Sequence, residues 1–345
     1  MIKVAVFDTK PYDKASFLAT AEGQDDLHMT FFETKLDADT VGLADGFDCV
    51  VIFVNDTADK AVIDHLYAHG VRLIALRCAG FNQVDVKAAF EKIHVVRVPA
   101  YSPYAIAEHA MAMLLTSVRR IHKAYNRTRE YNFSITGLCG FDLHGKTVGV
   151  VGAGKIGRAF INICNGFGMR VLAYDKYPDH AVQAEFVEPD ELFRESDIIS
   201  LHCPLTEENY HMIDARAISL MKKGVVLVNT SRGGLIDAEA LLEGIKMRKV
   251  GAVCLDVYEE ESDLFFEDRS GHILGDDVLA RLLSMPNVIL TAHQAFLTEE
   301  ALGNIAQTTL ANIRSFFAGE EPENEICYHC GKIGECRKLR QEKCF

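Results

Sequence analysis

Three glycines in the middle of the chain have the spacing of a turn that binds the phosphates of a dinucleotide. Gly152, Gly154 and Gly157 follow the apolar run 148–151, which predicts a buried parallel strand, and residues 159–167 continue as an amphipathic helix. Gly152 permits a tight turn, Gly154 lets the backbone approach a pyrophosphate, and Gly157 lets helix and strand pack closely. N–H groups at the start of the helix would hold the phosphates.

An acidic residue ends the next predicted strand, residues 170–174. Asp175 lies eighteen residues past Gly157, where an acid meets the adenosine ribose 2′-hydroxyl. An ordinary strand–helix turn followed by a surface aspartate is the alternative, but strand, helix and acid together favour a dinucleotide. Because an aspartate would repel a 2′-phosphate, the sequence predicts NAD rather than NADP.

Further reactive side chains stand where later predicted strands end. Ligands bind beyond the carboxyl ends of strands in open parallel sheets. Three residues stand at those ends. Arg232 lies in the segment Thr-Ser-Arg-Gly-Gly, Asp256 ends a strand, and His293 directly follows the last predicted strand. An arginine, acids and a histidine converging on one rim predict a reaction site.

Two sets of strand-like runs separated by helical segments would position these residues. Runs at 4–7, 49–54, 73–76 and 95–98, with helical spacing at 59–69 and 84–92, predict a flavodoxin-like parallel sheet. Runs at 148–151, 171–174, 198–202, 225–229, 252–256 and 288–291 predict a six-stranded Rossmann domain.

Two long helices connect the predicted domains. Ser102 and Pro103 indicate the start of a helix that reaches about residue 123, with a buried stripe that includes Ile106 and Ile121. The helical stretch 299–317 is expected to return to the first sheet. We therefore predict an α/β protein with a substrate domain of residues 1–101 plus 297–345 and an NAD-binding domain of residues 102–296. The chain would cross twice between them, with the cleft between the domains.

The composition limits the classes of partner and the cellular compartment that we expect for this chain. The 345 residues are 49% apolar and 25% charged, and the net charge of −13 argues against nucleic acid or anionic membrane as a general partner. A strand from Ile2 leaves no room for a signal peptide, and no apolar run reaches the roughly 18 residues of a membrane span. Ten cysteines, mostly scattered singly, indicate thiols in a reducing compartment, so we expect a cytoplasmic protein.

From residue 2 to about 325 the chain resembles the D-isomer-specific 2-hydroxyacid dehydrogenases. Besides the glycine turn, the resemblance lies in residues 77–82, 98–103, 107–110, 203–206, 229–237, 255–261 and 291–296. It is greatest to the fermentative members that form D-lactate. The resemblance implies reversible, NADH-dependent reduction of pyruvate.

The resemblance also implies a role for each reacting residue. His293 would be the general acid that protonates the carbonyl oxygen, and the base in reverse. Glu261 would lie beside it and raise its pKa, although Glu261 stands in an acidic run that could be a solvated loop. Arg232 would bind the substrate carboxylate with its rigid fork.

Other residues complete the implied site. Backbone N–H groups of Ala79 and Gly80 would hold the carboxylate, while Tyr101, Phe296 and Phe53 would leave room for little more than a methyl group. The cofactor would be held by the glycine turn and by a further set: Lys155, Ile156, Asp175, Cys203, Pro204, Asn209, Thr230, Ser231, Arg232 and Asp256. Ala292 stands where the family often has proline.

The sequence also allows two other functions. The chain could reduce another small 2-ketoacid, or could be a non-catalytic NAD-sensing protein, although it retains the arginine, glutamate and histidine. Apolar residues in the long helix from Pro103 and in the following residues 126–141 predict a homodimer or homotetramer. The tail carries Cys327, Cys330, Cys336 and Cys344, but a second pair of zinc ligands is absent, so we expect a packed or disordered tail and no metal.

Overall fold

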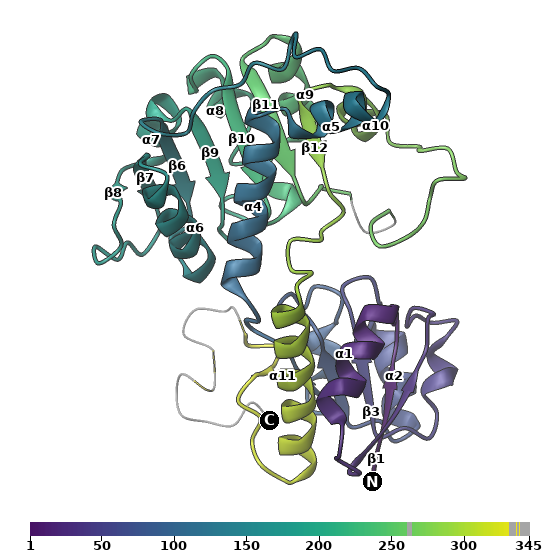
Figure 1. Ribbon diagram of the computed structural model, residues 1–345. Helices are drawn as coiled ribbons and strands as arrows, with labels where there is room; N and C mark the ends of the chain where they lie inside the picture. Colours follow the sequence, from purple (N-terminus) through teal and green to yellow (C-terminus); the bar gives the residue numbers. More distant parts are fainter. Residues whose placement is uncertain (261–263, 331–335, 337, 339–345) are drawn as a thin grey trace. The chain divides into compact units, whose positions relative to one another are not determined.

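The computed structural model describes residues 1–260, 264–330, 336 and 338, and the chain divides into two compact units. One unit contains Met1–Ser102 and Leu297–Phe345, and the other contains Pro103–Phe296. The chain therefore passes into the second unit after Ser102 and leaves it after Phe296. Figure 1 labels the elements of both units.

The first unit is built on a six-stranded sheet in the order β13-β5-β4-β3-β1-β2, parallel except for β13. Its strands are β1 (Ile2–Val6), β2 (Leu27–Phe31), β3 (Cys49–Ile52), β4 (Leu73–Leu76), β5 (His94–Val96) and β13 (Glu325–Ile326). Its helices are α1 (Pro11–Ala21), the 3₁₀ helix η1 (Val41–Ala44), α2 (Lys60–Ala68), α3 (Val86–Ala89) and α11 (Glu299–Phe317).

Helices α1 and α11 cover one face of this sheet. Phe17 of α1 and Leu310 and Ile313 of α11 are buried against Val4 and Val6 of strand β1. Helix α11 lies beside α1 in Figure 1. The last long helix therefore completes the core that the first hundred residues begin.

The second unit is built on seven parallel strands in the order β12-β11-β10-β9-β6-β7-β8. They are β6 (Thr147–Val151), β7 (Arg170–Tyr174), β8 (Glu185–Phe186), β9 (Ile198–Leu201), β10 (Val225–Asn229), β11 (Val250–Leu255) and β12 (Val288–Leu290). The helices are α4 (Pro103–Val118), α5 (Ile121–Arg129), α6 (Lys155–Gly166), α7 (Pro189–Glu195), α8 (Ala215–Leu220), η2 (Gly233–Leu235), α9 (Ala238–Lys246) and α10 (Asp277–Ser284).

Alternate residues of these strands enter two separate cores, as the two-residue period of a strand requires. Val226 and Val228 of β10 face Leu114 of α4 and Phe160 of α6, whereas Leu227 belongs to the core with helices α7–α10. The parallel sheet is thus covered on both faces, which explains the continuous apolar runs in the sequence. The predicted α/β class with two parallel sheets is confirmed.

The predicted helix from Pro103 to about residue 123 is wrong at its end. Helix α4 stops at Val118, and Arg120 has a φ of 56°, in the left-handed region, before α5 begins. Ile106 is buried as expected, but Ile121 is 52% exposed because it lies beyond the break.

Three strands were not expected from the sequence: β2, β8 and β13. β2 and β8 lie at sheet edges and are only partly buried, and β8 and β13 contain two residues each. Within the part of the chain that the structure describes, no helix has the length and apolar character that a membrane span requires.

Candidate active site at the carboxyl ends of the strands

The glycine turn joins β6 to α6 with little space around two of its glycines. Gly152 has a φ of 95°, and a Cβ there would lie 2.6 Å from the carbonyl oxygen of His202. A Cβ on Gly157 would lie 1.9 Å from the carbonyl oxygen of Gly152. At Gly154 a Cβ would meet no described atom within 4 Å. The turn is therefore closed toward the protein and open where a phosphate could approach α6.

A pocket of about 610 Å³ lies beside this turn. Its lining includes Gly152, Gly154, Asp175, Cys203, Pro204 and Asn209, six of the residues expected to bind the cofactor. The carboxylate of Asp175 accepts hydrogen bonds from the N–H groups of Ala153 (2.7 Å) and Tyr177 (2.9 Å). The acid is thus fixed against the turn, at the place where a ribose hydroxyl could meet it.

The loops after β9 and β10 support each other. Asn209 accepts from the N–H of Thr206 and donates to the carbonyl oxygen of Pro204, so its amide orders its own loop. The Ser231 hydroxyl donates to the carbonyl oxygen of Cys203 at 2.7 Å. The buried Oγ1 of Thr230 has no hydrogen-bond partner among the described residues. An orphan hydroxyl on this rim is a group that a bound cofactor could satisfy.

Arg232 is the third residue after β10. Asn229, the last residue of that strand, donates its amide to the carbonyl oxygen of Arg232 at 2.8 Å. The guanidinium Nη1 of Arg232 donates to the carbonyl oxygen of Ser231 at 2.6 Å. The arginine is half-buried and its backbone is held by the strand end, so it could present the rest of its fork to a carboxylate.

His293 lies on a turn that Asp256 organises. The N–H of His293 donates to the carbonyl oxygen of Asp256 at 2.7 Å, and the carboxylate of Asp256 accepts from the N–H groups of Gln294 (2.9 Å) and Ala295 (2.8 Å). These bonds hold His293 at a φ of 50°, which few residues other than glycine adopt. The half-buried imidazole lies with its ring centroid 6.0 Å from that of Phe266.

Two residues without a predicted role join this arrangement. Thr291 donates its hydroxyl to the carboxylate of Asp256, and Nε2 of His109 lies 3.4 Å from the same carboxylate. Asp256 is fully buried; burial raises its pKa, but the hydrogen bonds from His109, Thr291 and the backbone outweigh this and hold the pKa below its ordinary value. The carboxylate is therefore charged at neutral pH. In the sequence, His109 could have been noticed because it lies in residues 107–110, one of the segments on which the family resemblance rests.

His202 differs from His293 although both follow strands. It is buried, its Nε2 lies 2.8 Å from the hydroxyl of Ser200, and burial lowers its pKa to about 3. It is a neutral packing residue at physiological pH and is unsuited to proton transfer there.

The first unit carries its own group of expected site residues at the carboxyl ends of β3 and β4. For the N–H groups of Ala79 and Gly80 we find no acceptor among the described residues, and Arg97 fixes the segment by donating to the carbonyl oxygen of Ala79 at 2.8 Å. Phe53 is buried with the guanidinium of Arg77 4.3 Å from its ring centroid. The carbonyl oxygen of Tyr101 accepts from the Asn304 amide.

Some expected residues fall elsewhere. Glu261 lies outside the described residues, as does Cys344 of the tail. Phe296 is buried, and it belongs to the second unit. In the tail, the N–H of Cys327 donates to Sγ of Cys330 at 3.3 Å.

Known proteins that resemble this chain identify its family. Residues 111–295 match the family described as D-isomer specific 2-hydroxyacid dehydrogenase, NAD binding domain. The D-lactate dehydrogenase of Escherichia coli is 52% identical over 94% of this chain and 100% of its own length. The chain belongs to the D-isomer-specific 2-hydroxyacid dehydrogenase family.

Two solved structures extend the comparison. The pyruvate reductase of Chlamydomonas reinhardtii matches with a TM-score of 0.90 and 44% identity, over 94% of this chain and 98% of that one. A D-isomer specific 2-hydroxyacid dehydrogenase from Lactobacillus delbrueckii ssp. bulgaricus, in its NAD-complexed form, matches with a TM-score of 0.81 and 29% identity, over 94% of this chain and 100% of that one. The protein is an NAD-dependent oxidoreductase of 2-hydroxyacids.

Proposed function

We propose that this protein reduces pyruvate to D-lactate with NADH. The observation that carries the proposal is the 52% identity to a D-lactate dehydrogenase over that relative's whole length. The similarity to a pyruvate reductase supports the same substrate. Arg232, Asp256 and His293 follow three neighbouring strands, β10, β11 and β12, which fits one reaction site.

The cofactor would be held by residues of the second unit. The turn from Gly152 to Gly157 would hold the pyrophosphate, helped by N–H groups of Lys155 and Ile156, and Asp175 would accept from the adenosine ribose. Cys203, Pro204, Asn209, Thr230, Ser231 and Asp256 would line the rest of the binding site. When bound, NADH supplies the hydride for the reduction.

The chain's own residues would supply the substrate contacts and the proton. Arg232 would bind the carboxylate and polarise the ketone, and the N–H groups of Ala79 and Gly80 would hold the same carboxylate. His293 would donate a proton to the carbonyl oxygen, with Glu261 favouring its charged form. The hydrogen bonds from His293, Gln294 and Ala295 to Asp256 support this role because they fix the backbone that carries the imidazole.

Three aromatic residues would set the size of the accepted side chain. Tyr101, Phe296 and Phe53 favour a methyl group, although one extra methylene is worth only about 1–3 kcal/mol of discrimination. A relative that is 33% identical is a D-2-hydroxyisocaproate dehydrogenase, so a larger 2-ketoacid is the second candidate.

The test is NADH oxidation with pyruvate, 2-ketobutyrate, hydroxypyruvate and glyoxylate, with the chirality of each product determined. We expect the highest kcat/KM for pyruvate and D-lactate as its product. A higher kcat/KM for another substrate would replace pyruvate, an L-product would refute the assignment, and NADH binding without turnover would indicate a sensing protein. We also propose that the protein works in the cytoplasm, which localisation of the tagged full chain would test.

A further inference from the structure

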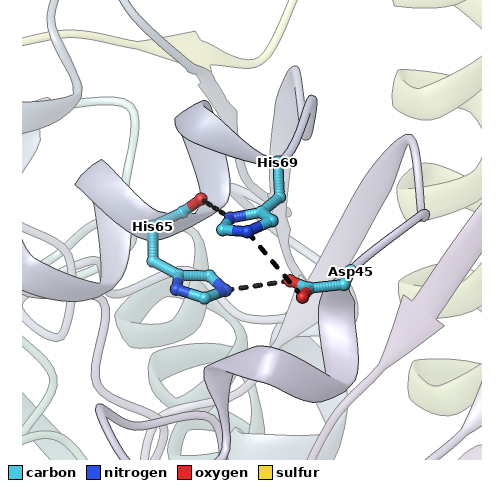
Figure 2. Close-up of side chains that lie close together, drawn as sticks. All are labelled: Asp45, His65 and His69. Atoms are coloured by element: carbon cyan, nitrogen blue, oxygen red, sulfur yellow. Dashed lines mark hydrogen bonds and ion pairs between the residues drawn. The ribbon is translucent and has the colours of Figure 1, made fainter.

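Two histidines and an aspartate meet on the surface of the first unit (Figure 2). His65 lies in the last turn of α2 and His69 caps the end of this helix, so the two are neighbours on one helix face. Asp45 follows η1 and points at both rings. One nitrogen from each imidazole and one oxygen of Asp45 lie within 4.8 Å of one another.

A backbone hydrogen bond fixes the protonation of one ring. Nδ1 of His69 lies 2.8 Å from the carbonyl oxygen of His65. A carbonyl oxygen can only accept, so Nδ1 must carry the proton. In the neutral ring, Nε2 of His69 then has a free lone pair and faces Asp45. Histidines that bind metals typically donate their other ring N–H to a carbonyl or carboxylate oxygen in this way.

The spacing of the three groups suits a metal ion. Nε2 of His65 lies 2.8 Å from Oδ1 of Asp45, and Nε2 of His69 lies 3.9 Å from Oδ2. Metal–ligand bonds of about 2.1 Å at tetrahedral angles separate neighbouring ligand atoms by roughly 3.4 Å. The two observed separations bracket that value, so small side-chain rotations would place all three atoms around one ion. Nε2 of His65, which donates to Asp45 here, would give up its proton to Nδ1 of the same ring or to solvent when the ion binds.

A histidine–aspartate hydrogen bond accounts for Nε2 of His65, whereas Nε2 of His69 lies 3.9 Å from the carboxylate, too far for a hydrogen bond. The two imidazoles stack with their centroids 4.0 Å apart, and a like-charged pair of imidazolium rings would repel at that distance. Two neutral rings avoid this repulsion, and the neutral imidazole is the form that binds a metal ion. The side chains are 31%, 43% and 46% exposed for His65, His69 and Asp45, so an ion could enter from solvent and keep water ligands.

We propose that Asp45, His65 and His69 bind a divalent transition metal ion such as Zn²⁺, Co²⁺ or Ni²⁺. Two imidazole nitrogens and one carboxylate oxygen suit these ions rather than Mg²⁺ or Ca²⁺, which prefer oxygen ligands. The carbonyl groups at the end of α2 would add favourable negative potential.

This site is separate from the expected reaction site within the same unit. Asp45 precedes β3 and His69 precedes β4, so both lie at the amino-terminal edge of the sheet. Phe53 and Ala79 follow those strands and lie at the opposite edge. We therefore infer that the metal ties α2 to η1 and stabilises the fold, and that turnover does not require it.

Titration with Co²⁺ of the chelator-treated full chain would test the site. We expect saturable binding of one equivalent with d–d absorption and a higher midpoint of thermal unfolding. His65→Gln and His69→Gln should each weaken the Co²⁺ affinity at least about tenfold and abolish the thermal shift. His28→Gln, on an exposed histidine of β2 in the same unit, is the matched control and should change neither.

Three results would overturn the proposal: no saturable binding, an affinity within twofold of the parent chain in both variants, or an equal loss in His28→Gln. A thiolate charge-transfer band that persists in the variants would assign the ion to the tail cysteines instead. The rate of NADH oxidation should be unchanged by the chelator, and a loss of rate would contradict a purely stabilising ion.

Discussion

At the scale of single residues, the position of His293 depends on Asp256. The carbonyl oxygen and the carboxylate of Asp256 together accept three N–H groups of residues 293–295. The buried charge is compensated by these bonds and by His109 and Thr291. Asp256 therefore positions the backbone that carries the imidazole.

Replacing His293 tests the proton transfer. We expect His293→Asn to lower kcat for pyruvate reduction about 10²–10⁴-fold, because the proton donor is lost, while NADH binding stays nearly intact. Stopped-flow kinetics and NADH fluorescence titration measure the two quantities. A variant with near-normal turnover would remove His293 from the mechanism.

Removing the charge of Asp256 tests the anchoring of this turn. Its pKa is lower in the folded chain than in the unfolded chain, so its stabilising effect is present above about pH 4 and is lost as the pH falls through the folded pKa. Asp256→Asn should therefore lower the free energy of unfolding at pH 7, and the difference from the parent chain should shrink toward pH 3. Urea unfolding at a series of pH values measures this difference, and a difference independent of pH would contradict it.

Replacing Asp175 tests whether its carboxylate makes the protein prefer NADH over NADPH. Asp175→Ser should raise kcat/KM with NADPH relative to NADH by at least about tenfold, because the repulsion of the 2′-phosphate is removed. Initial rates with the two cofactors give the ratio. An unchanged ratio would show that another residue excludes NADPH.

At the scale of elements, the sequence is most informative where strands are buried on both faces. β6, β9 and β10 are buried along their whole length and were expected within one or two residues. β2 and β8 lie at sheet edges, so their residues need not be uniformly apolar and the pattern misses them. The end of α4 was missed because Arg120 adopts a left-handed conformation that its residue type does not signal.

The same limit applies to the site. The glycine turn and Asp175 could be recognised because their signal is local, within one strand–helix–strand unit. His109 and Asp256 are in contact although they lie 147 positions apart in the sequence. A pattern within one strand or helix therefore cannot predict this contact. The two-residue strand β13, which closes the edge of the first sheet, depends in the same way on a partner far back in the chain.

A pair of glycine substitutions separates packing from cofactor binding at the turn between β6 and α6. Gly157→Ala should destabilise the chain by about 1–3 kcal/mol or more, because its Cβ would overlap the carbonyl oxygen of Gly152. Gly154→Ala should leave the unfolding midpoint unchanged and weaken NADH binding, because its Cβ would enter open space where the pyrophosphate approaches. Thermal unfolding and NADH titration distinguish the two, and equal effects of both substitutions would refute this division.

At the scale of the whole molecule, the segment after α4 carries apolar side chains that the chain leaves exposed. Tyr131, Phe133 and Ile135 are 85%, 73% and 83% exposed, and Tyr125 of α5 is 58% exposed. Large apolar side chains gathered on one exposed segment often mark an interface between proteins. This supports the expected homodimer or homotetramer.

The oligomeric state can be tested with charged substitutions in this segment. Sedimentation of the parent chain should give the mass of a dimer or tetramer, and the double variant Phe133→Asp with Ile135→Asp should give a lower mass because two charges would be buried in the interface. Met247→Asp, at another exposed apolar residue of the second unit, is the control and should keep the parent mass. A monomeric parent chain would contradict the prediction.

The most direct test of the proposed reaction site is a crystal structure of the full chain with NADH and an unreactive analogue of pyruvate. We expect a ring nitrogen of His293 within about 2.6–3.2 Å of the analogue's carbonyl oxygen, and the guanidinium of Arg232 on its carboxylate. An imidazole of residue 293 out of reach of that oxygen, with both ligands bound, would contradict it.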